Sequence, residues 1–233
     1  MGRFIITGKD QNKVAKNDRI QFNDYWDIPV VYHPTHTGKI IINIPGAGGS
    51  INGFKDKYYN WGNHIQKNGL ASFVRIPNER PQDFILTARV VINYCLENAL
   101  EICGVKEPEI WMIGFSAGGA SVLFSAWEYP EITKALVINP FLNLDKLRVE
   151  ATKDLPLFEG ELSVYIGKED SVISPDTGEF IKEYASKVSQ LSINYIDGCD
   201  HQLKGEKSSK FLSGLPFKCF ANQEIEGIDL LNH

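Results

Sequence analysis

A serine held between two glycines is the residue in this sequence best suited to chemistry. Gly114, Ser116 and Gly118 form a Gly-x-Ser-x-Gly motif, which follows an apolar run at 110–113 and precedes a cluster of small residues. This order predicts a buried strand, a sharp turn and a helix packed against that strand, because glycine tolerates the close approach that the turn requires. The turn would expose the Ser116 hydroxyl as a nucleophile. A close-packed turn without any chemistry would give the same motif, so further residues must decide between the two.

Two later loops carry the base and the acid that a serine nucleophile needs. A serine hydroxyl is a weak nucleophile near neutral pH and requires a base within hydrogen-bond reach. His201 follows the predicted strand at 191–196 and could accept the proton and later return it. Asp170 follows the predicted strand at 161–167 and could hold the imidazole in the required tautomer. Asp145 is an alternative acid, since it lies in the loop one strand earlier.

A glycine-rich loop could supply hydrogen-bond donors for an oxyanion. Residues 46–49 read Gly-Ala-Gly-Gly and follow an apolar strand. The expected donors are the backbone N–H of Ala117 and the N–H of Ala47, with Gly48 as the alternative to Ala47. The same loop does not fit a nucleotide-binding site, because Phe54 stands where the phosphate-binding lysine is required. A nucleotide is therefore not expected as a cofactor.

Strands and helices alternate along most of the chain. The apolar patterns predict strands at 3–7, 27–33, 39–44, 71–76, 110–115, 134–139, 161–167 and 191–196, and helices near 54–65, 82–102, 117–129 and 175–188. This alternation favours an α/β fold with a doubly wound, mostly parallel sheet. Sites in open parallel sheets form at the carboxyl ends of the strands, where the serine, the acid, the histidine and the glycine loop are all expected.

Composition and charge restrict the class of protein. The 233 residues are 43% hydrophobic and 23% charged, which is typical of a globular chain long enough to bury a core. We expect one domain over 1–233, in which 214–233 show no clear pattern. The net charge of −5 argues against nucleic acid as a partner, and no apolar run is long enough to span a membrane. The four cysteines lack metal-binding spacing and the first residues lack a signal peptide, so we expect a cytoplasmic protein without a metal.

The three motifs together resemble those of the α/β-hydrolase superfamily. The resemblance covers about 27–201 and rests on Gly-Phe-Ser-Ala-Gly-Gly at 114–119, Gly-Lys-Glu-Asp-Ser-Val-Ile-Ser-Pro at 167–175 and Gly-Cys-Asp-His at 198–201. It is closest to small members without a cap domain, similar to dienelactone hydrolases or acyl-protein thioesterases. The glycine loop at 45–49 departs from many members because it lacks a histidine.

The resemblance implies a serine hydrolase that uses no cofactor and no metal. Ser116, His201 and Asp170 would form its catalytic triad. The substrate would be a small or medium carboxylic ester, thioester or lactone that forms an acyl-enzyme. The stretch 140–160 is too short for a large cap domain, so we expect an open, shallow site. Apolar walls for this site are expected from Phe54, Phe115, Phe141 and Ile173.

Two other functions are compatible with the same residues. A peptidase or amidase could use the same triad, and a binding protein could keep the scaffold without turnover. Arg80 follows the predicted strand at 71–76 and could bind a substrate carboxylate, but a solvated loop arginine would give the same sequence. Hydrolysis of a p-nitrophenyl ester, compared with that of a p-nitroanilide, separates the three functions.

Overall fold

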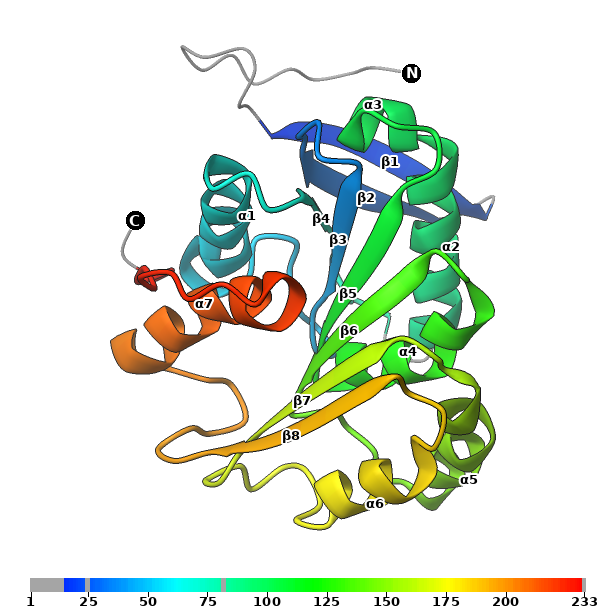
Figure 1. The fold of residues 1–233 in the computed structure, drawn as a ribbon, viewed down its shortest axis with the longest axis vertical. Coiled ribbons are helices and arrows are strands. Elements are labelled where there is room, and N and C mark those ends of the chain that lie inside the picture. The colour runs from blue at the N-terminus through cyan, green and yellow to red at the C-terminus, as the bar shows by residue number, and fades with distance from the viewer. Residues whose placement is uncertain (1–14, 24–25, 81–82, 232–233) are drawn as a thin grey trace.

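An eight-stranded sheet runs through the middle of the molecule (Figure 1). The computed structural model describes residues 15–23, 26–80 and 83–231. The strand order is β1-β2-β4-β3-β5-β6-β7-β8, in which β2 is antiparallel to β1 and β4, and the strands from β4 to β8 run parallel. The strands are β1 (Lys16–Asn23), β2 (Trp26–His33), β3 (Lys39–Ile44), β4 (Ser72–Arg75), β5 (Glu109–Phe115), β6 (Ile132–Ile138), β7 (Glu161–Gly167) and β8 (Gln190–Ile196).

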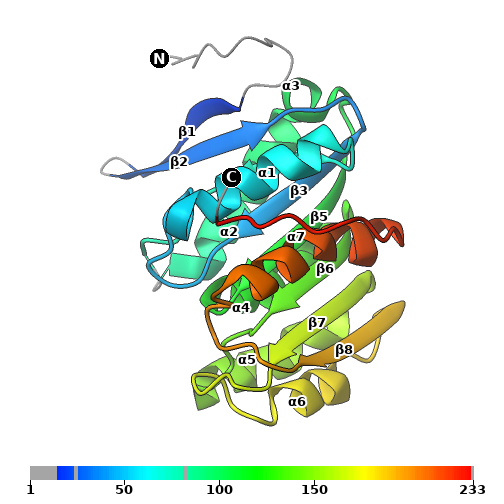
Figure 2. The ribbon, with the colours of Figure 1, turned by 90° about the vertical axis from the view of Figure 1, so that its left-hand side faces the viewer.

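Helices cover both faces of the sheet (Figures 1 and 2). One face carries α1 (Lys57–Lys67) and α7 (Glu206–Ala221). The other face carries α2 (Phe84–Glu97), α3 (Ala99–Cys103), α4 (Ala117–Ser125), α5 (Asp145–Asp154) and α6 (Thr177–Tyr184). Short 3₁₀ helices are η1 (Phe54–Asp56), η3 (Ala126–Glu128) and η4 (Leu155–Leu157). The doubly wound α/β fold that the sequence predicts is therefore confirmed.

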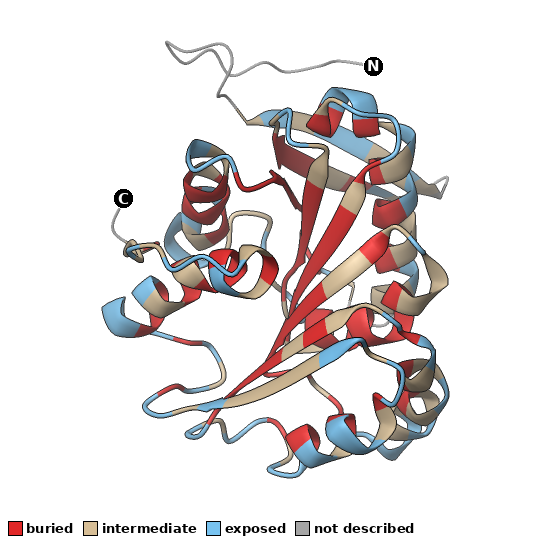
Figure 3. Cartoon of the chain, viewed as in Figure 1, coloured by how far each residue is buried: buried red, intermediate tan, exposed pale blue. Residues whose placement is uncertain are grey.

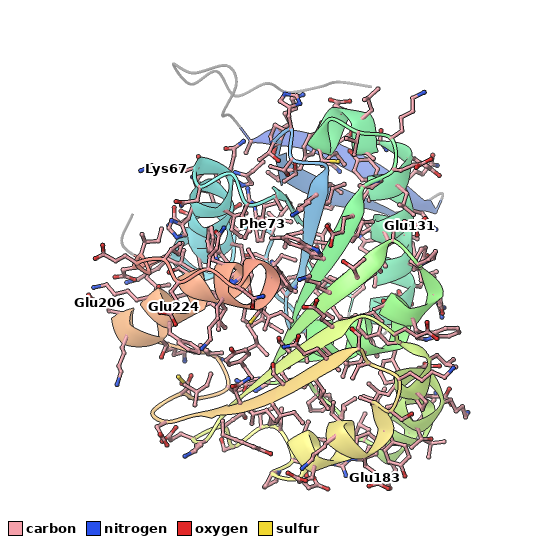
Figure 4. The ribbon with its side chains drawn as sticks, viewed as in Figure 1. Lys67, Phe73, Glu131, Glu183, Glu206 and Glu224 are labelled. Atoms are coloured by element: carbon pink, nitrogen blue, oxygen red, sulfur yellow. The ribbon has the colours of Figure 1, made fainter. Side chains whose placement is uncertain are left out.

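Alternate side chains of the central strands enter two separate hydrophobic cores. Ile40 of β3 belongs to the core that contains residues of α2 to α6, whereas the next residue, Ile41, belongs to the core that contains Trp61 of α1. The strands in the middle of the sheet are buried on both faces (Figure 3), as parallel strands covered by helices generally are. In Figure 4, Phe73 of β4 lies inside the molecule near α1, while Lys67 at the end of that helix points outward.

Several elements differ from the sequence predictions. The apolar patterns miss β1, whose sequence is largely polar, and they merge α2 with α3, which are separated at Asn98. Leu100 of α3 is 60% exposed, although a single helix over 82–102 would place this apolar residue toward the core. The patterns also miss α7, because Gly214 and Pro216 lie inside it and both residues normally weaken or end a helix. The strand predicted at 3–7 lies outside the described residues.

The carboxyl ends of the parallel strands are left open by the connection between β6 and β7. This connection contains only α5 and η4 with their loops, so it inserts no large cap domain, as expected. β3, β5, β6, β7 and β8 are consecutive in the sheet, which brings the loops that follow them to one edge. In the part of the chain that the structure describes, every helix is too short or too polar to cross a membrane.

Candidate active site

Ser116 occupies a strained turn between β5 and α4. Its backbone has φ 50° and ψ −117°, a conformation that residues other than glycine rarely adopt. The turn is tight: a Cβ atom at Gly114 would collide with the carbonyl of Gly118, and one at Gly118 would collide with that of Ile44. The Ser116 N–H donates to Ile138 O at 3.0 Å, which fixes the turn against β6. The geometry is that of the sharp strand–turn–helix predicted from the motif.

His201 and Asp170 form a chain of hydrogen bonds that ends at Ser116. His201 Nε2 lies 2.9 Å from Ser116 Oγ, and His201 Nδ1 lies 2.7 Å from Asp170 Oδ2. An ionised carboxylate can only accept, so Nδ1 carries the proton and the Nε2 lone pair faces the serine hydroxyl. Asp145, the alternative acid, instead begins α5 as an exposed residue.

The Asp170 carboxylate is held from both sides. Its side chain is fully buried, and Oδ1 accepts hydrogen bonds from the N–H groups of Val172 (2.7 Å) and Ile173 (3.1 Å). These two backbone donors fix the orientation of the carboxylate. Oδ2 is thereby left pointing at the imidazole.

Asn139 joins the loops that carry the acid and the histidine, and the sequence analysis misses it. It follows β6, is buried, and has a left-handed backbone with φ 46°. Its Nδ2 donates to the carbonyls of Asp200 (3.2 Å) and His201 (3.1 Å), while its Oδ1 accepts from the N–H of Gly167 (2.8 Å). The only signal in the sequence is an asparagine directly after a strand, where asparagine tolerates this backbone conformation.

The glycine loop after β3 lies directly against the serine. A Cβ atom at Gly46 would come within 3.2 Å of the Ser116 Cβ. The N–H of Gly48 donates to Asn78 O at 2.7 Å, so this group is already used and Ala47 is the better candidate donor. Ala117 begins α4, and N–H groups in the first turn of a helix have no partner within that helix. The N–H groups of Ala47 and Ala117 are therefore the candidate oxyanion donors.

A cavity of about 1240 Å³ opens beside Ser116 and His201. It is lined by Phe54, Phe115 and Phe141, three of the four apolar residues expected at the site. Phe84, Leu144, Leu147, Val172 and Leu231 also line it, and the sequence analysis misses them. Leu144 and Leu147, at the start of α5, belong to this lining.

This protein resembles known proteins in its three-dimensional structure, whereas the sequence comparisons find no match. No protein-family model and no curated protein sequence matches the chain. A dienelactone hydrolase from Anabaena variabilis superposes with a TM-score of 0.69 at 14% identity, over 92% of this chain and 100% of the other. The esterase Est2 of Thermogutta terrifontis gives a TM-score of 0.66 at 17% identity, over 88% and 94%.

The chain has the α/β-hydrolase fold. A putative dipeptidyl aminopeptidase IV from Bacteroides ovatus also matches, with a TM-score of 0.71 at 12% identity, over 91% of this chain and 36% of that longer one. The fold therefore agrees with the resemblance that the motifs indicate.

Two residues that sequence analysis connects with the site lie outside the cavity of this α/β-hydrolase fold. Ile173 is 5% exposed and packs in the core, so its assignment as a cavity wall is wrong. The preceding residue, Val172, is 45% exposed and lines the cavity in its place. Arg80 pairs with Asp83 at 3.1 Å and lies over the ring of Trp26, away from the cavity lining.

Unusual backbone conformations gather in the loops around the cavity. Six described residues other than glycine have a positive φ. Five of them lie in these loops: Lys55, Asp56, Ser116, Asn139 and Leu203. Among the described residues, no group of three or more His, Cys, Asp and Glu side chains is arranged to hold a metal ion.

Proposed function

We propose that this protein is a serine hydrolase that cleaves a small or medium carboxylic ester, thioester or lactone. The observation that carries the proposal is the pair of hydrogen bonds from Asp170 through His201 to Ser116, at 2.7 and 2.9 Å. A serine, an imidazole and a carboxylate in this order are the groups that activate a hydroxyl for attack on a carbonyl carbon.

The first half of the proposed reaction forms an acyl-enzyme. Ser116 Oγ attacks the carbonyl carbon while its proton passes to His201 Nε2, and the carbonyl oxygen becomes an oxyanion. The N–H groups of Ala47 and Ala117 would donate to that oxyanion, and such donors contribute about 2.7–4 kcal/mol each to the transition state. The bond to the leaving alcohol or thiol then breaks as Nε2 returns the proton to it. Asp170 stabilises the imidazolium throughout.

The second half releases the acid. A water molecule gives its proton to His201 Nε2 and attacks the acyl carbon, so a second oxyanion forms at the same donors. The bond between the acyl carbon and Ser116 Oγ breaks, and the proton moves from Nε2 to Oγ. The products are the free carboxylic acid and the regenerated enzyme.

The named neighbours support an ester rather than an amide as substrate. Two of the proteins compared above are an esterase and a dienelactone hydrolase, and the esterase is described with bound propionate. The similarity to a putative dipeptidyl aminopeptidase IV keeps a peptidase or amidase on the same triad as the second candidate.

Two measurements test the proposal. A fluorophosphonate probe should label the protein once, and peptide mapping should place the label on Ser116. p-Nitrophenyl acetate should be hydrolysed much faster than a p-nitroanilide. Faster anilide cleavage would favour the peptidase, whereas no labelling and no turnover of either substrate would leave a binding protein on a hydrolase scaffold.

A further inference from the structure

Three lysines line the cavity, and within the described residues no aspartate or glutamate does. Lys55 and Lys57 belong to the segment where η1 leads into α1, and Lys204 belongs to the loop that follows His201. The chain as a whole carries a net charge of −5, so the charge of the cavity lining is opposite in sign to that of the protein. A cleft lined by charges of one sign raises the local concentration of ligands of the opposite sign.

Lys57 is the lysine that contacts the residue before the nucleophile. Its ammonium is 5.2 Å from the centre of the Phe115 ring, and Phe115 directly precedes Ser116. The Tyr58 ring lies at 5.0 Å from the same ammonium. In the described part of the chain, the Lys57 ammonium contacts these two rings, and no carboxylate lies within ion-pair distance of it. Lys57 therefore lines the cavity without a direct ion-pair partner among the described residues, and the charge of Asp200 acts on it only from a longer distance.

Two features of its surroundings disfavour this positive charge. Burial lowers the pKa of Lys57 to about 8, although the negative charge of Asp200 acts in the opposite direction. Lys57 is also the first residue of α1, where the helix dipole repels a cation and where the first turn holds no acidic residue. An anion bound beside the ammonium would relieve both effects.

The wall of the cavity formed by α2, α5 and the loops after β6 and β7 is apolar. It comprises Phe84, Phe141, Leu144, Leu147 and Val172. A ligand that fits both walls has a negative group at one end and an apolar group at the other, with the scissile bond between them at Ser116.

We propose that Lys57 binds a carboxylate of the substrate, so that the site selects esters or thioesters with a carboxylate at one end and an apolar group at the other. This inference rests on the proposed ester hydrolysis, because it assigns a substrate class to the same site. The reaction steps are unchanged, since Lys57 only binds the charged end.

Matched pairs of substrates test this selection. In the first pair the acyl group differs, between p-nitrophenyl pentanoate and the p-nitrophenyl half-ester of glutaric acid, which replaces a terminal methyl by a carboxylate. In the second pair the alcohol differs, between the acetate ester of 4-methylphenol and 4-acetoxybenzoate. We expect kcat/KM of the charged member to exceed that of the neutral member by about tenfold in one of the two pairs, because charge-assisted hydrogen bonds are the strong ones.

Three variants assign that preference to one side chain. Lys57→Met should reduce the charged-to-neutral ratio about tenfold, and Lys57→Arg should retain most of it because the charge remains. Lys67→Met removes the same charge from the exposed end of α1 and should leave the ratio as in the wild type. A ratio near one in both pairs, or one that Lys57→Met leaves unchanged, would overturn the inference while ester hydrolysis itself stands.

A binding measurement tests the contact between Lys57 and a carboxylate without any ester hydrolysis. Calorimetry with hexanoate should show weaker binding to Lys57→Met than to wild type, and binding to Lys67→Met should match wild type. This result would support the carboxylate site even if no ester were hydrolysed, in which case the proposed function alone would fail. Equal hexanoate binding to wild type and Lys57→Met would reject the site.

Discussion

Removing the Asn139 side chain should damage catalysis without affecting substrate binding. This side chain donates to the carbonyls of Asp200 and His201 and accepts from the N–H of Gly167, so it sets the distance between the loop of the base and that of the acid. Asn139 is not part of the cavity lining. We therefore expect Asn139→Gly to lower kcat and to leave KM nearly unchanged.

The expected losses in stability and in kcat follow from the three hydrogen bonds of Asn139. A buried group that loses its partner costs about 1–3 kcal/mol, and the Gly167 N–H is buried whereas Asp200 is exposed to water. We expect the free energy of unfolding to fall by about 2–4 kcal/mol. A displacement of the histidine by about 1 Å would reduce kcat by about 100-fold.

Two further substitutions of Asn139 distinguish the loss of its hydrogen bonds from the cost of its left-handed backbone. Asn139→Ala adds the backbone cost of a left-handed conformation, about 1–2 kcal/mol, so it should be less stable than Asn139→Gly but equally slow. Asn139→Asp keeps an acceptor for Gly167 and loses both donations to the histidine loop, so its kcat should fall as far as that of the glycine variant.

The assay is steady-state hydrolysis of p-nitrophenyl acetate combined with urea unfolding. Asn194→Ala is the matched control, because within the described part of the chain the Asn194 side chain of β8 makes a single, long hydrogen bond, to Val164 O at 3.5 Å. A kcat within twofold of wild type for Asn139→Gly would refute the positioning role, as would a loss that appears in KM.

Three other predictions concern the triad and a buried histidine. Ser116→Ala should lower kcat by about 10⁶ with an unchanged circular dichroism spectrum, and a variant that keeps a tenth of the activity would exclude the serine mechanism. Asp170→Asn should lower kcat by about 10⁴, whereas Asp145→Asn should have little effect, and the reverse ranking would move the acid to Asp145. Burial, aided by the positive charge of Arg75, lowers the pKa of His33 from 6.5 to about 3, so stability is retained above pH 6.5 and lost as the pH falls towards 3. Between pH 6.5 and about pH 4.5 this residue should remove about 2 kcal/mol from the free energy of unfolding, and His33→Leu should lack that part of the dependence in urea titrations.

The proximity of the candidate catalytic residues could be predicted from the sequence because they lie at the ends of strongly apolar strands. Ser116, Asp170 and His201 each follow a buried or half-buried strand, so a parallel sheet places them at one edge whatever the exact length of the helices. The glycines around Ser116 add a steric requirement that few other turns have.

The remaining features depend on contacts that no local pattern contains. β1 is polar because it lies at the sheet edge, and α7 tolerates Pro216 because packing against the sheet stabilises the helix around it. The predicted lining residue, Ile173, and the observed one, Val172, differ by one position in a loop, where neighbouring side chains point in different directions. Asn139 acts through backbone atoms far along the chain, and a sequence shows none of them.

The strained loops around the cavity have a consequence for how this protein could change under selection for heat resistance. Left-handed backbone at a residue with a side chain costs about 1–2 kcal/mol, and Lys55 and Asp56 have it although their side chains are exposed. Glycine at these positions would release that free energy, as it already does at Gly48 and Gly53. It would also give the loops new conformations in the absence of substrate. Laboratory evolution on melting temperature alone should therefore accumulate glycines there, whereas evolution that also demands turnover should keep the larger residues.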